Sequence, residues 1–253
     1  MIILKKTNEI VMFTQHHHAF LSGEIAKHFK TDRFQSIDHW GELMLAIYEH
    51  DRSWIGLDET PIWNDEKEVP YSFIDYPLIP KLAFYKIGID EIEQMSPYAA
   101  LLCSMHYCSF FKRSMDKRVD KFLEAEEKRQ TKIINTLNLL DGKLQSQHFR
   151  LLQFCDDLSL YLCLNEPGTK KVEEYPWFRD GMANSEIFSE ENKPLYAEWL
   201  NNKEVAVHSF PFKEEFDLKL QYKRVPKNLI REKGIAPAYH AIEVIEYEVK
   251  ITR

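Results

Sequence analysis

Residues 147–164 read QHFRLLQFCDDLSLYLCL, and this stretch does most to decide the class of fold. Its apolar residues recur at helical spacing, and Ser146 directly before it can accept hydrogen bonds from the free amides of a first helical turn. His148, Leu152 and Asp156 fall on the same face of that helix. An imidazole and a carboxylate on a face that should be buried indicate a helical core built around polar chemistry.

Outward from this stretch, the same periodicity predicts further helices. They are expected at residues 18–29, 36–50, 97–110 and 115–140. The first three each carry a histidine on the apolar face, namely His18, His50 and His106. The 36–50 helix should be capped by Ser36, and Pro97 occupies the first position of its helix, where proline is favoured. Four helices therefore direct ionisable side chains toward one core.

The two ends of the chain have a different pattern. Residues 1–14 alternate around a turn-like Thr7-Asn8-Glu9, which is typical of a β-hairpin. After a short helix expected at 193–201, β-rich or alternating runs follow at residues 205–212, 216–224 and 242–251. We expect these strands to form a small accessory sheet together with the N-terminal hairpin.

These observations predict a mainly α fold, with one domain over residues 1–253. Its parts are a helical core at 15–165, accessory β elements at 1–14 and 203–253, and a segment rich in proline and aromatic residues at 55–82. That last segment contains too many prolines for one continuous helix and is too apolar for a free linker. We interpret it as an ordered lid.

The composition excludes some classes of partner. The chain has 253 residues, 44% of them hydrophobic, and a formal net charge of −7. That charge gives no general field to attract a nucleic acid polymer. No window reaches the length of a membrane span, and the start of the chain lacks the features of a signal peptide. We expect a cytoplasmic protein with a small-molecule substrate, and a homodimer is left open.

The histidines and carboxylates on the apolar faces favour a metal site. A lone histidine on such a face is usually a satisfied core residue, but a buried carboxylate without a partner is costly. A shared cation would resolve the whole set, which comprises His18, His50, Asp51, His106, His148 and Asp156. Imidazole nitrogen together with carboxylate oxygen suits manganese, iron, nickel, zinc or cobalt, with magnesium less well matched. We expect one or two such divalent ions.

The order of these residues resembles a known signature. It is similar to the H…HD…D pattern of the HD-domain superfamily of metal-dependent phosphohydrolases. The matching residues are His18, then His50-Asp51 closing a helix, then Asp156. Closer motifs look like an uncharacterised bacterial family, a domain of unknown function, related to that superfamily. They are T-Q-x-x-H-A at 14–19, H-D-x-x-W at 50–54, P-Y-A-x-L-x-x-S-M-H at 97–106 and D-x-L-S-L at 156–160. The similarity spans about residues 1–165 and, more weakly, the C-terminal strands.

The resemblance implies an HD-like helical core in which His18, His50, Asp51 and Asp156 hold a metal ion. His106 and His148 are candidates for a second ion or for phosphate contact. The implied reaction is hydrolysis of a small phosphoester, with a nucleotide as one candidate substrate and with water activated at the metal. Asp51 would orient that water, and His106 or His148 would stabilise charge or protonate the leaving oxygen.

Two neighbours of the doublet are candidates for substrate binding. Arg52 could bind an anionic group, although a surface salt bridge is the commoner fate of such a residue. Trp54 could form a pocket wall or simply belong to the core. No clear Lys or Arg stands at a phosphate-contacting position of the motif, so two alternatives stay open. One is oxidation at a paired-iron site, as in some members of the superfamily, and the other is a non-catalytic ligand-binding or regulatory module stabilised by metal.

Overall fold

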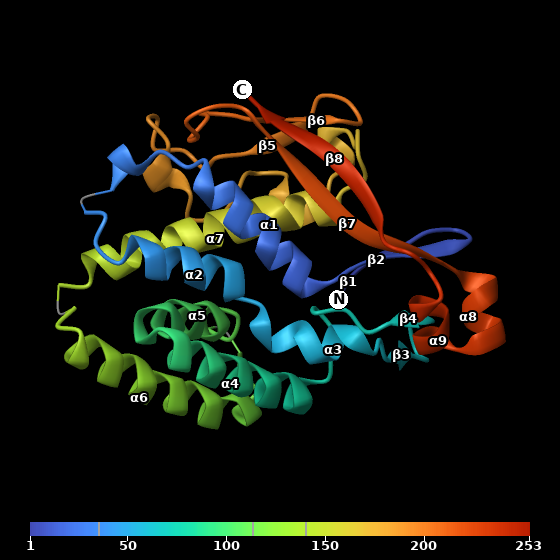
Figure 1. Ribbon diagram of the computed structural model, residues 1–253, viewed down its shortest axis with the longest axis horizontal. Coiled ribbons are helices and arrows are strands. Elements are labelled where there is room, and N and C mark those ends of the chain that lie inside the picture. Colours follow the sequence, from blue (N-terminus) through green and yellow to red (C-terminus); the bar gives the residue numbers. More distant parts are fainter. Residues whose placement is uncertain (35, 113, 140) are drawn as a thin grey trace.

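The fold combines a β-sheet with a layer of helices (Figure 1). The structure is a computed structural model that describes residues 1–34, 36–112, 114–139 and 141–253. Within those residues, six strands form one sheet of order β1-β2-β7-β8-β6-β5. In that order the strands are β1 (Ile2–Lys5), β2 (Glu9–Phe13), β7 (Phe216–Pro226), β8 (Ile245–Thr252), β6 (Glu204–Val207) and β5 (Ala197–Trp199).

The sheet joins the two ends of the chain. The β1–β2 hairpin pairs antiparallel with β7, so that Ile10 lies opposite Val225. Strand β7 pairs antiparallel with β8, whereas β8 and β6 run parallel. Along β7 the side chains of Phe216, Leu218 and Leu220 are buried and the residues between them are exposed. This period of two gives the sheet one apolar face, which packs on helices.

The predicted mainly α, HD-like core with a small accessory sheet is wrong. The protein has a mixed α/β fold, 52% helical and 16% strand, with a curled half-barrel sheet. The N-terminal hairpin and the C-terminal strands do share this sheet, as expected. Its extent escaped prediction because the parallel β6–β8 pairing joins segments far apart in the sequence. In addition, β5 lies where a helix at 193–201 was expected, because its pairing with β6 overrides the local propensity.

The helices form the second part of the fold. In chain order they are α1 (Gln15–Lys27), α2 (Trp40–Glu49), α3 (Ile55–Glu59), α4 (Leu78–Met95), α5 (Pro97–Ser109), α6 (Asp120–Thr136), α7 (Lys143–Leu164), α8 (Lys227–Lys233) and α9 (Ile235–His240). Helix α1 contacts β7 on one side and α2 and α7 on the other. Helix α5 contacts α2, α4, α6 and α7. The four helices predicted to carry ionisable residues therefore pack around a common centre.

Several predicted helix boundaries differ from those observed. Helix α1 begins at Gln15, and α7 begins at Lys143, so Ser146 lies inside α7 and does not cap it. Helix α2 begins at Trp40 rather than near Ser36, because His39 adopts a left-handed conformation with φ 57° that interrupts the helix. Ser36 instead accepts a hydrogen bond from the amide of Asp38. The helix expected at 115–140 is α6, which ends at Thr136, and the predicted end at position 140 lies outside the described residues.

The proline-rich segment 55–82 is ordered and contains regular structure. It includes α3, a short pair of strands, β3 (Trp63–Asn64) and β4 (Val69–Pro70), and the start of α4. Pro80 lies in the first turn of α4, where a missing amide hydrogen costs no helical hydrogen bond. Helices α4, α8 and α9 were not predicted. Pro237 lies in the first turn of α9, and this proline, like Pro80 in α4, argued against a helix in the sequence.

The hydrophobic core spans the interface between sheet and helices. Its main cluster includes Phe13 and Leu218 from the sheet together with Ile25, Leu102 and Leu158 from the helices. A smaller second cluster lies between the β1–β2 hairpin, β7 and helices α8 and α9. Because each fully buried Leu or Ile side chain contributes about 1.5–3 kcal/mol, the main cluster holds the helices firmly against the sheet.

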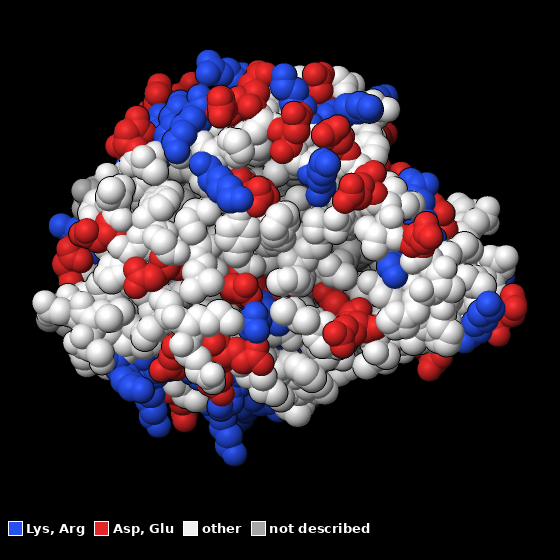
Figure 2. All heavy atoms as spheres, viewed as in Figure 1, with Lys and Arg blue, Asp and Glu red and all other residues white. Residues whose placement is uncertain are grey.

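The surface carries mixed charge. On the face drawn in Figure 2, basic and acidic side chains are interspersed among uncharged ones, with several acidic side chains near the middle, and no broad basic patch is visible. Among the described residues, no helix combines the length and the apolar character that crossing a bilayer requires.

Candidate metal centre

Four helices bring histidines and carboxylates to one point. His18 lies in the first turn of α1, whose start is fixed by Thr14 accepting a hydrogen bond from the His17 amide. His50 ends α2, and Asp51 follows it directly. His106 comes from the last turn of α5. The remaining carboxylate, Asp156, comes from the middle of α7.

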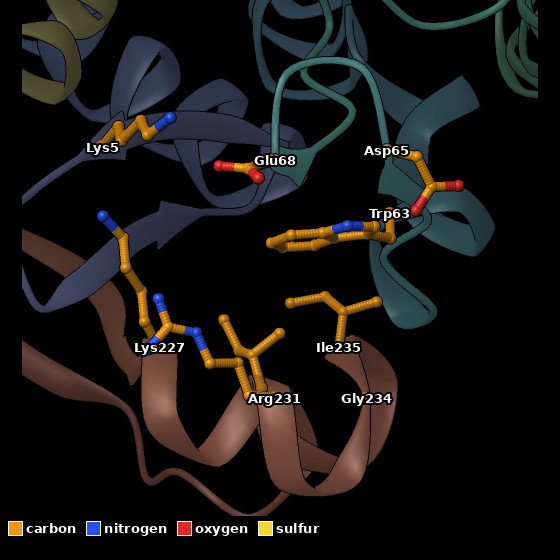
Figure 3. Close-up of a pocket in the computed structure, with 9 residues that line it drawn as sticks. Lys5, Trp63, Asp65, Glu68, Lys227, Arg231, Gly234 and Ile235 are labelled. Carbon is orange, nitrogen blue, oxygen red and sulfur yellow. The ribbon is translucent and has the colours of Figure 1, made fainter.

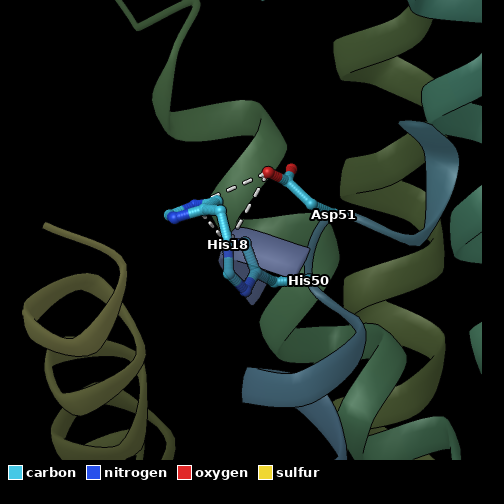
Figure 4. Close-up of side chains that lie close together, drawn as sticks. All are labelled: His18, His50 and Asp51. Atoms are coloured by element: carbon cyan, nitrogen blue, oxygen red, sulfur yellow. Dashed lines mark hydrogen bonds and ion pairs between the residues drawn. The ribbon is translucent and has the colours of Figure 1, made fainter. Parts of the chain in front are cut away.

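The ligand atoms of this cluster are close together. The Nε2 atom of His18 lies 2.8 Å from Oδ1 of Asp156 and 3.7 Å from Oδ2 of Asp51. The Nε2 atom of His50 lies 3.4 Å from the same Asp156 oxygen and 3.8 Å from the same Asp51 oxygen. Figure 4 shows His18 and His50 converging on the Asp51 carboxylate. All of these side chains are buried.

His106 approaches the cluster from the other side of Asp156. Its Nε2 atom lies 3.6 Å from Oδ2 of Asp156, the oxygen that does not face His18. Within the described residues, two groups have ligand atoms within 4.8 Å of one another: His18, His50 and Asp51, and His50, His106 and Asp156. Both groups require the same Nε2 atom of His50. One imidazole nitrogen has a single lone pair, so the two groups cannot each bind an ion through it.

Hydrogen bonds behind the imidazoles orient them for ligation. The Nδ1 atom of His50 donates to the carbonyl oxygen of Ile47 at 2.8 Å, which directs the Nε2 atom toward the carboxylates. The Nδ1 atom of His18 lies 2.5 Å from Oγ of Ser159, whose hydroxyl donates to the Asp156 carbonyl at 2.9 Å. Such partners fix the tautomer and the ring direction of metal-binding histidines. The cluster therefore has the supporting contacts of a metal site.

A glutamine supports the carboxylate in a similar way. The side-chain amide of Gln15 donates to Oδ2 of Asp51 at 2.8 Å. The Gln15 backbone amide donates to Oδ2 of Asp58 at 2.5 Å, and Asp58 also pairs with the N-terminal ammonium group of Met1 at 2.6 Å. Gln15 is thus held at the start of α1 by a buried network, and it limits the directions in which the Asp51 carboxylate can turn.

Burial and neighbouring charges shift the pKa values of the cluster in opposite directions. Burial lowers the pKa of His50, but Asp51 and Asp156 outweigh it and raise the value to about 9. Burial raises the pKa of Asp51 to about 6, although His50 and His18 act against this. Burial alone would raise the pKa of Asp156, yet hydrogen bonds from His18 and His50 hold it well below its usual range. Without a metal ion, therefore, imidazole protons supply the positive charge that Asp156 requires.

His106 differs from the other imidazoles in its charge. Burial lowers its pKa to about 3, even though the charge of Asp156 acts in the opposite direction. It is consequently neutral near pH 7. Its Nδ1 atom is buried and has no hydrogen-bond partner among the described residues. A neutral imidazole with a free lone pair is a metal ligand or a hydrogen-bond acceptor more readily than a proton donor.

The cluster lies at the floor of a cavity of about 410 Å³, which we call the metal pocket. Its walls are mostly aromatic, and segment 55–82 contributes Phe73, Ile74 and Lys81 to them. The other large side chains of the lining are Trp54, Tyr85, Phe110, Phe111, Leu160 and Trp177. Lys81 and Asp157 are the charged groups on the wall outside the cluster, as far as the described lining shows. Trp54, expected at a pocket wall or in the core, is buried and lines the pocket as well.

The structure does not bring His148 to this cluster. His148 lies two turns before Asp156 on α7, which corresponds to about 12 Å along a helix. Its Nδ1 atom lies 2.7 Å from the hydroxyl oxygen of Tyr98, and its ring contacts Phe34 and Trp40. A shared helix face was thus correctly inferred, but the face extends beyond the site.

Arg52 also lies away from the metal pocket. Its guanidinium donates to Glu91 at 2.6 Å and to Glu49 at 3.0 Å. These partners are partly exposed, and the ion pairs cross from the end of α2 to α4 on the outer surface. The surface salt bridge, which was the alternative interpretation of Arg52, is what the structure contains.

Several residues of the site were not predicted. Gln15 and Ser159 stand inside the quoted motifs next to His18 and Asp156, so their spacing on the same helices was the signal available. Asp157, which follows Asp156 on α7, also lines the metal pocket. Lys81 carried no local signal, because its position depends on how the segment before α4 folds over the cluster.

The fold and this cluster define a mixed α/β protein with a buried histidine and carboxylate centre at the floor of a pocket. The chain belongs to the family described as "Protein of unknown function (DUF3891)", which it matches over residues 1–227. The prediction of an uncharacterised family is confirmed, and all members of the cluster lie within the matched residues. No curated protein and no solved structure matches the chain in these comparisons. What the protein does must therefore be argued from its own geometry.

Proposed function

We propose that this protein is a metal-dependent hydrolase that acts on a small phosphoester. The observation that carries the proposal is the convergence of His18, His50, Asp51 and Asp156 at the floor of the metal pocket. The order of these ligands along the chain resembles that of the HD-domain phosphohydrolases, which supports the same chemistry. This support comes from the ligand order alone, because the fold around the ligands is mixed α/β.

The donor set fits a divalent transition ion. Two imidazole nitrogens and two carboxylates suit manganese, iron, nickel, zinc or cobalt better than magnesium. The shared nitrogen of His50 favours one ion held by His18, His50, Asp51 and Asp156, with His106 beside it. An ion there would neutralise the buried carboxylates and take over the role of the imidazole protons. The need of the buried carboxylates for positive charge therefore favours a metal site over a polar core that is satisfied without metal.

The residues of the pocket have separable roles in hydrolysis. The bound ion would supply Lewis acidity and lower the pKa of a coordinated water. Asp51, whose carboxylate accepts a hydrogen bond from Gln15, would hold the ion and orient the coordinated water. The Nε2 atom of neutral His106 lies 3.6 Å from Asp156, whereas its Nδ1 atom has no hydrogen-bond partner among the described residues. The aromatic walls keep bulk water away from these groups.

Lys81 suits the anionic part of the substrate. Its ammonium group donates to the carbonyl oxygen of Phe73 at 3.1 Å, which places it in the wall of the metal pocket. Burial lowers its pKa, and the charge of Asp75 partly offsets that effect. A lysine is a common point-charge partner of phosphate. It provides the cation that the sequence motif lacked.

The shape of the pocket supports a compact substrate with an apolar or aromatic body. A volume of about 410 Å³ lies in the range of small-ligand sites. Aromatic residues such as Phe73, Phe110 and Trp177 offer flat surfaces for a ring. The same open space argues against a purely structural metal site, in which side chains would fill every coordination position.

A paired-iron oxidation site is the less favoured alternative. Two overlapping ligand groups would be consistent with two ions, yet both depend on the same nitrogen of His50. Elemental analysis separates the alternatives, because two irons per chain would favour oxidation and one ion of another kind would favour hydrolysis.

The test begins with metal content. Purified wild-type protein and an Asp51→Ala variant are compared by plasma mass spectrometry, with Asp38→Ala as the control. Asp38 is exposed and precedes His39, so it forms the same pair of residue types in reverse order. We expect a stoichiometric divalent ion in the wild type and in the control, and its loss in Asp51→Ala.

Activity is then measured with the ion that is found. A panel of phosphomonoesters and phosphodiesters should reveal turnover that the Asp51→Ala variant lacks. Absence of metal from the wild type, even after reconstitution, would overturn the proposal. Stoichiometric metal without any phosphoester turnover would leave a metal-stabilised binding module as the better description.

A further inference from the structure

A second cavity lies between the N-terminal hairpin, the β3–β4 hairpin and the last two helices. It has a volume of about 530 Å³, and we call it the α8–α9 pocket. Strand β1 contributes Lys5, the β3–β4 hairpin contributes Trp63 and Glu68, and helices α8 and α9 contribute Lys227, Arg231 and Ile235. It shares no described lining residue with the metal pocket.

Three basic side chains form one wall of this pocket. Figure 3 shows the ends of Lys5, Lys227 and Arg231 pointing into the same space. The ammonium group of Lys5 donates to the Lys67 carbonyl at 3.2 Å, and that of Lys227 donates to the Thr7 carbonyl at 3.1 Å. Both are held by neutral acceptors, so their charges are not cancelled by these contacts.

Arg231 is the basic group available for a ligand. Among the described residues it makes no hydrogen bond and no ion pair, and its side chain is exposed at the pocket. A planar guanidinium presents a rigid fork of donors that matches two oxygens of a phosphate. With two lysines beside it, Arg231 makes this wall complementary to an anion that carries more than one oxygen.

The opposite wall is apolar and flat. Figure 3 shows the indole ring of Trp63 extending into the pocket with Ile235 beneath it. Ile230 and Ile235 belong to the smaller hydrophobic cluster, and Trp63 packs against that cluster. The indole is therefore supported from behind and offers a firm face for stacking with a planar ring.

Acidic groups define the remaining part of the pocket. Figure 3 shows the Glu68 carboxylate between Lys5 and Trp63, whereas Asp65 lies beyond Trp63 at the rim. No described basic side chain pairs with Glu68 within salt-bridge distance, so its oxygens can accept hydrogen bonds from hydroxyl or amino groups. A carboxylate between the basic wall and the indole would repel a long polyanion. It suits a ligand with a neutral polar portion between its anionic group and its ring.

We propose that the α8–α9 pocket binds a nucleoside monophosphate or diphosphate. The phosphate lies against Lys5, Lys227 and Arg231, the base stacks on Trp63, and the ribose hydroxyls donate to Glu68. This order of anion, polar link and planar ring matches the order of groups across the pocket. The site is separate from the metal pocket, so the inference does not depend on the proposed hydrolase activity.

Isothermal titration calorimetry with AMP and ADP tests the proposal, with adenosine and inorganic phosphate as part-ligands. The protein is first stripped of metal with a chelator, so that the metal pocket does not contribute. Two variants are compared with the wild type: Arg231→Gln and Trp63→Leu. Arg118→Gln is the control, because Arg118 is an exposed arginine in the turn just before α6 whose described partner is Asp116. Circular dichroism confirms that each variant is folded.

We expect AMP or ADP to bind once per chain, more tightly than either part-ligand. Arg231→Gln should weaken binding of both the nucleotide and phosphate by about tenfold, the effect of losing one charged contact. Trp63→Leu should weaken nucleotide and adenosine binding and leave phosphate binding unchanged. Lack of nucleotide binding, or nucleotide binding that both variants leave unchanged, would overturn the proposal. Phosphate binding as tightly as AMP would also overturn it, because the ring would then contribute nothing.

Discussion

The metal pocket and the α8–α9 pocket handle charge in opposite ways. In the first, Asp51 and Asp156 are buried and surrounded by imidazoles, so their negative charge must be balanced by positive charge inside the protein. In the second, Lys5 and Arg231 stand exposed at the wall, where water already solvates them. Loss of a charge should therefore disturb the first pocket strongly and the second only when a ligand is present. Burial, more than the number of charges, determines how much each group matters.

The largest effect is expected for Asp156→Asn. The Asp156 carboxylate contacts His18, His50 and His106, so the amide removes the charge that three imidazoles share. We expect loss of the bound ion and a fall in phosphoester hydrolysis beyond the roughly 10–100-fold typical of losing a hydrogen-bond partner of a ligand. Metal analysis and steady-state kinetics are the measurements. Full metal occupancy in this variant would contradict the contrast drawn between the two pockets, because the buried charge of Asp156 would then not be needed for metal binding.

The exposed Asp38→Asn variant is the control for that experiment. It removes the same charge from a surface aspartate, so metal content and activity should remain at wild-type levels. A comparable loss in both variants would indicate a general effect on folding, and thermal denaturation curves would reveal it.

A smaller effect is expected from pH. Without metal, the pKa of His50 is raised to about 9, so near pH 7 this imidazole carries a proton that must leave when it becomes a ligand. Metal binding should therefore release about one proton per ion. Affinity should rise by up to about tenfold for each unit that the pH increases toward about 9, and it should level off above that value. Calorimetric titration in buffers of different ionisation enthalpy measures the released proton. No proton release near neutral pH would show that His50 is already neutral before the metal binds, which would contradict the raised pKa.

The third effect is expected from the support behind His18. Ser159→Ala removes the hydroxyl that lies 2.5 Å from Nδ1 of His18, while the ligand itself is kept. Loss of such a partner typically lowers metal affinity by about 10–100-fold. Competition with a chelator of known affinity provides the measurement. Ser104→Ala is the matched control, because Ser104 is a buried serine on α5 that accepts from Gln130. Equal affinities in the two variants would argue against an orienting role for Ser159.

The sequence located the centre of the site better than it located the fold. Histidines and carboxylates on the buried faces of helices are constrained by local periodicity, and His18, His50, Asp51, His106 and Asp156 do come together. His148 shows the limit of that reasoning, because residues on one helix face can share a direction and still lie two turns apart.

The fold depended on information that is not local. Strand β8 inserts between β7 and β6, and the parallel pairing with β6 joins segments separated by a long stretch of chain. Local alternation detects most strands of the sheet, although not β5, and it does not reveal their partners, which explains why the sheet was underestimated. Lys81 and Trp63 were missed as pocket residues for a related reason, because segment 55–82 acquires its path only by packing against distant elements.

The smallest of these effects is expected for Lys81→Gln. This variant tests whether the metal pocket binds the anionic part of its substrate through a basic side chain, as we propose for the α8–α9 pocket. If the phosphoester contacts Lys81, the variant should raise KM by roughly tenfold or less, with kcat changed by no more than about twofold, because the metal ligands are intact. The control is Lys86→Gln on the same helix, whose ammonium group pairs with Asp90 on the surface. Equal KM values for Lys81→Gln and wild type would remove Lys81 from substrate binding and leave the aromatic walls as the main determinant of affinity.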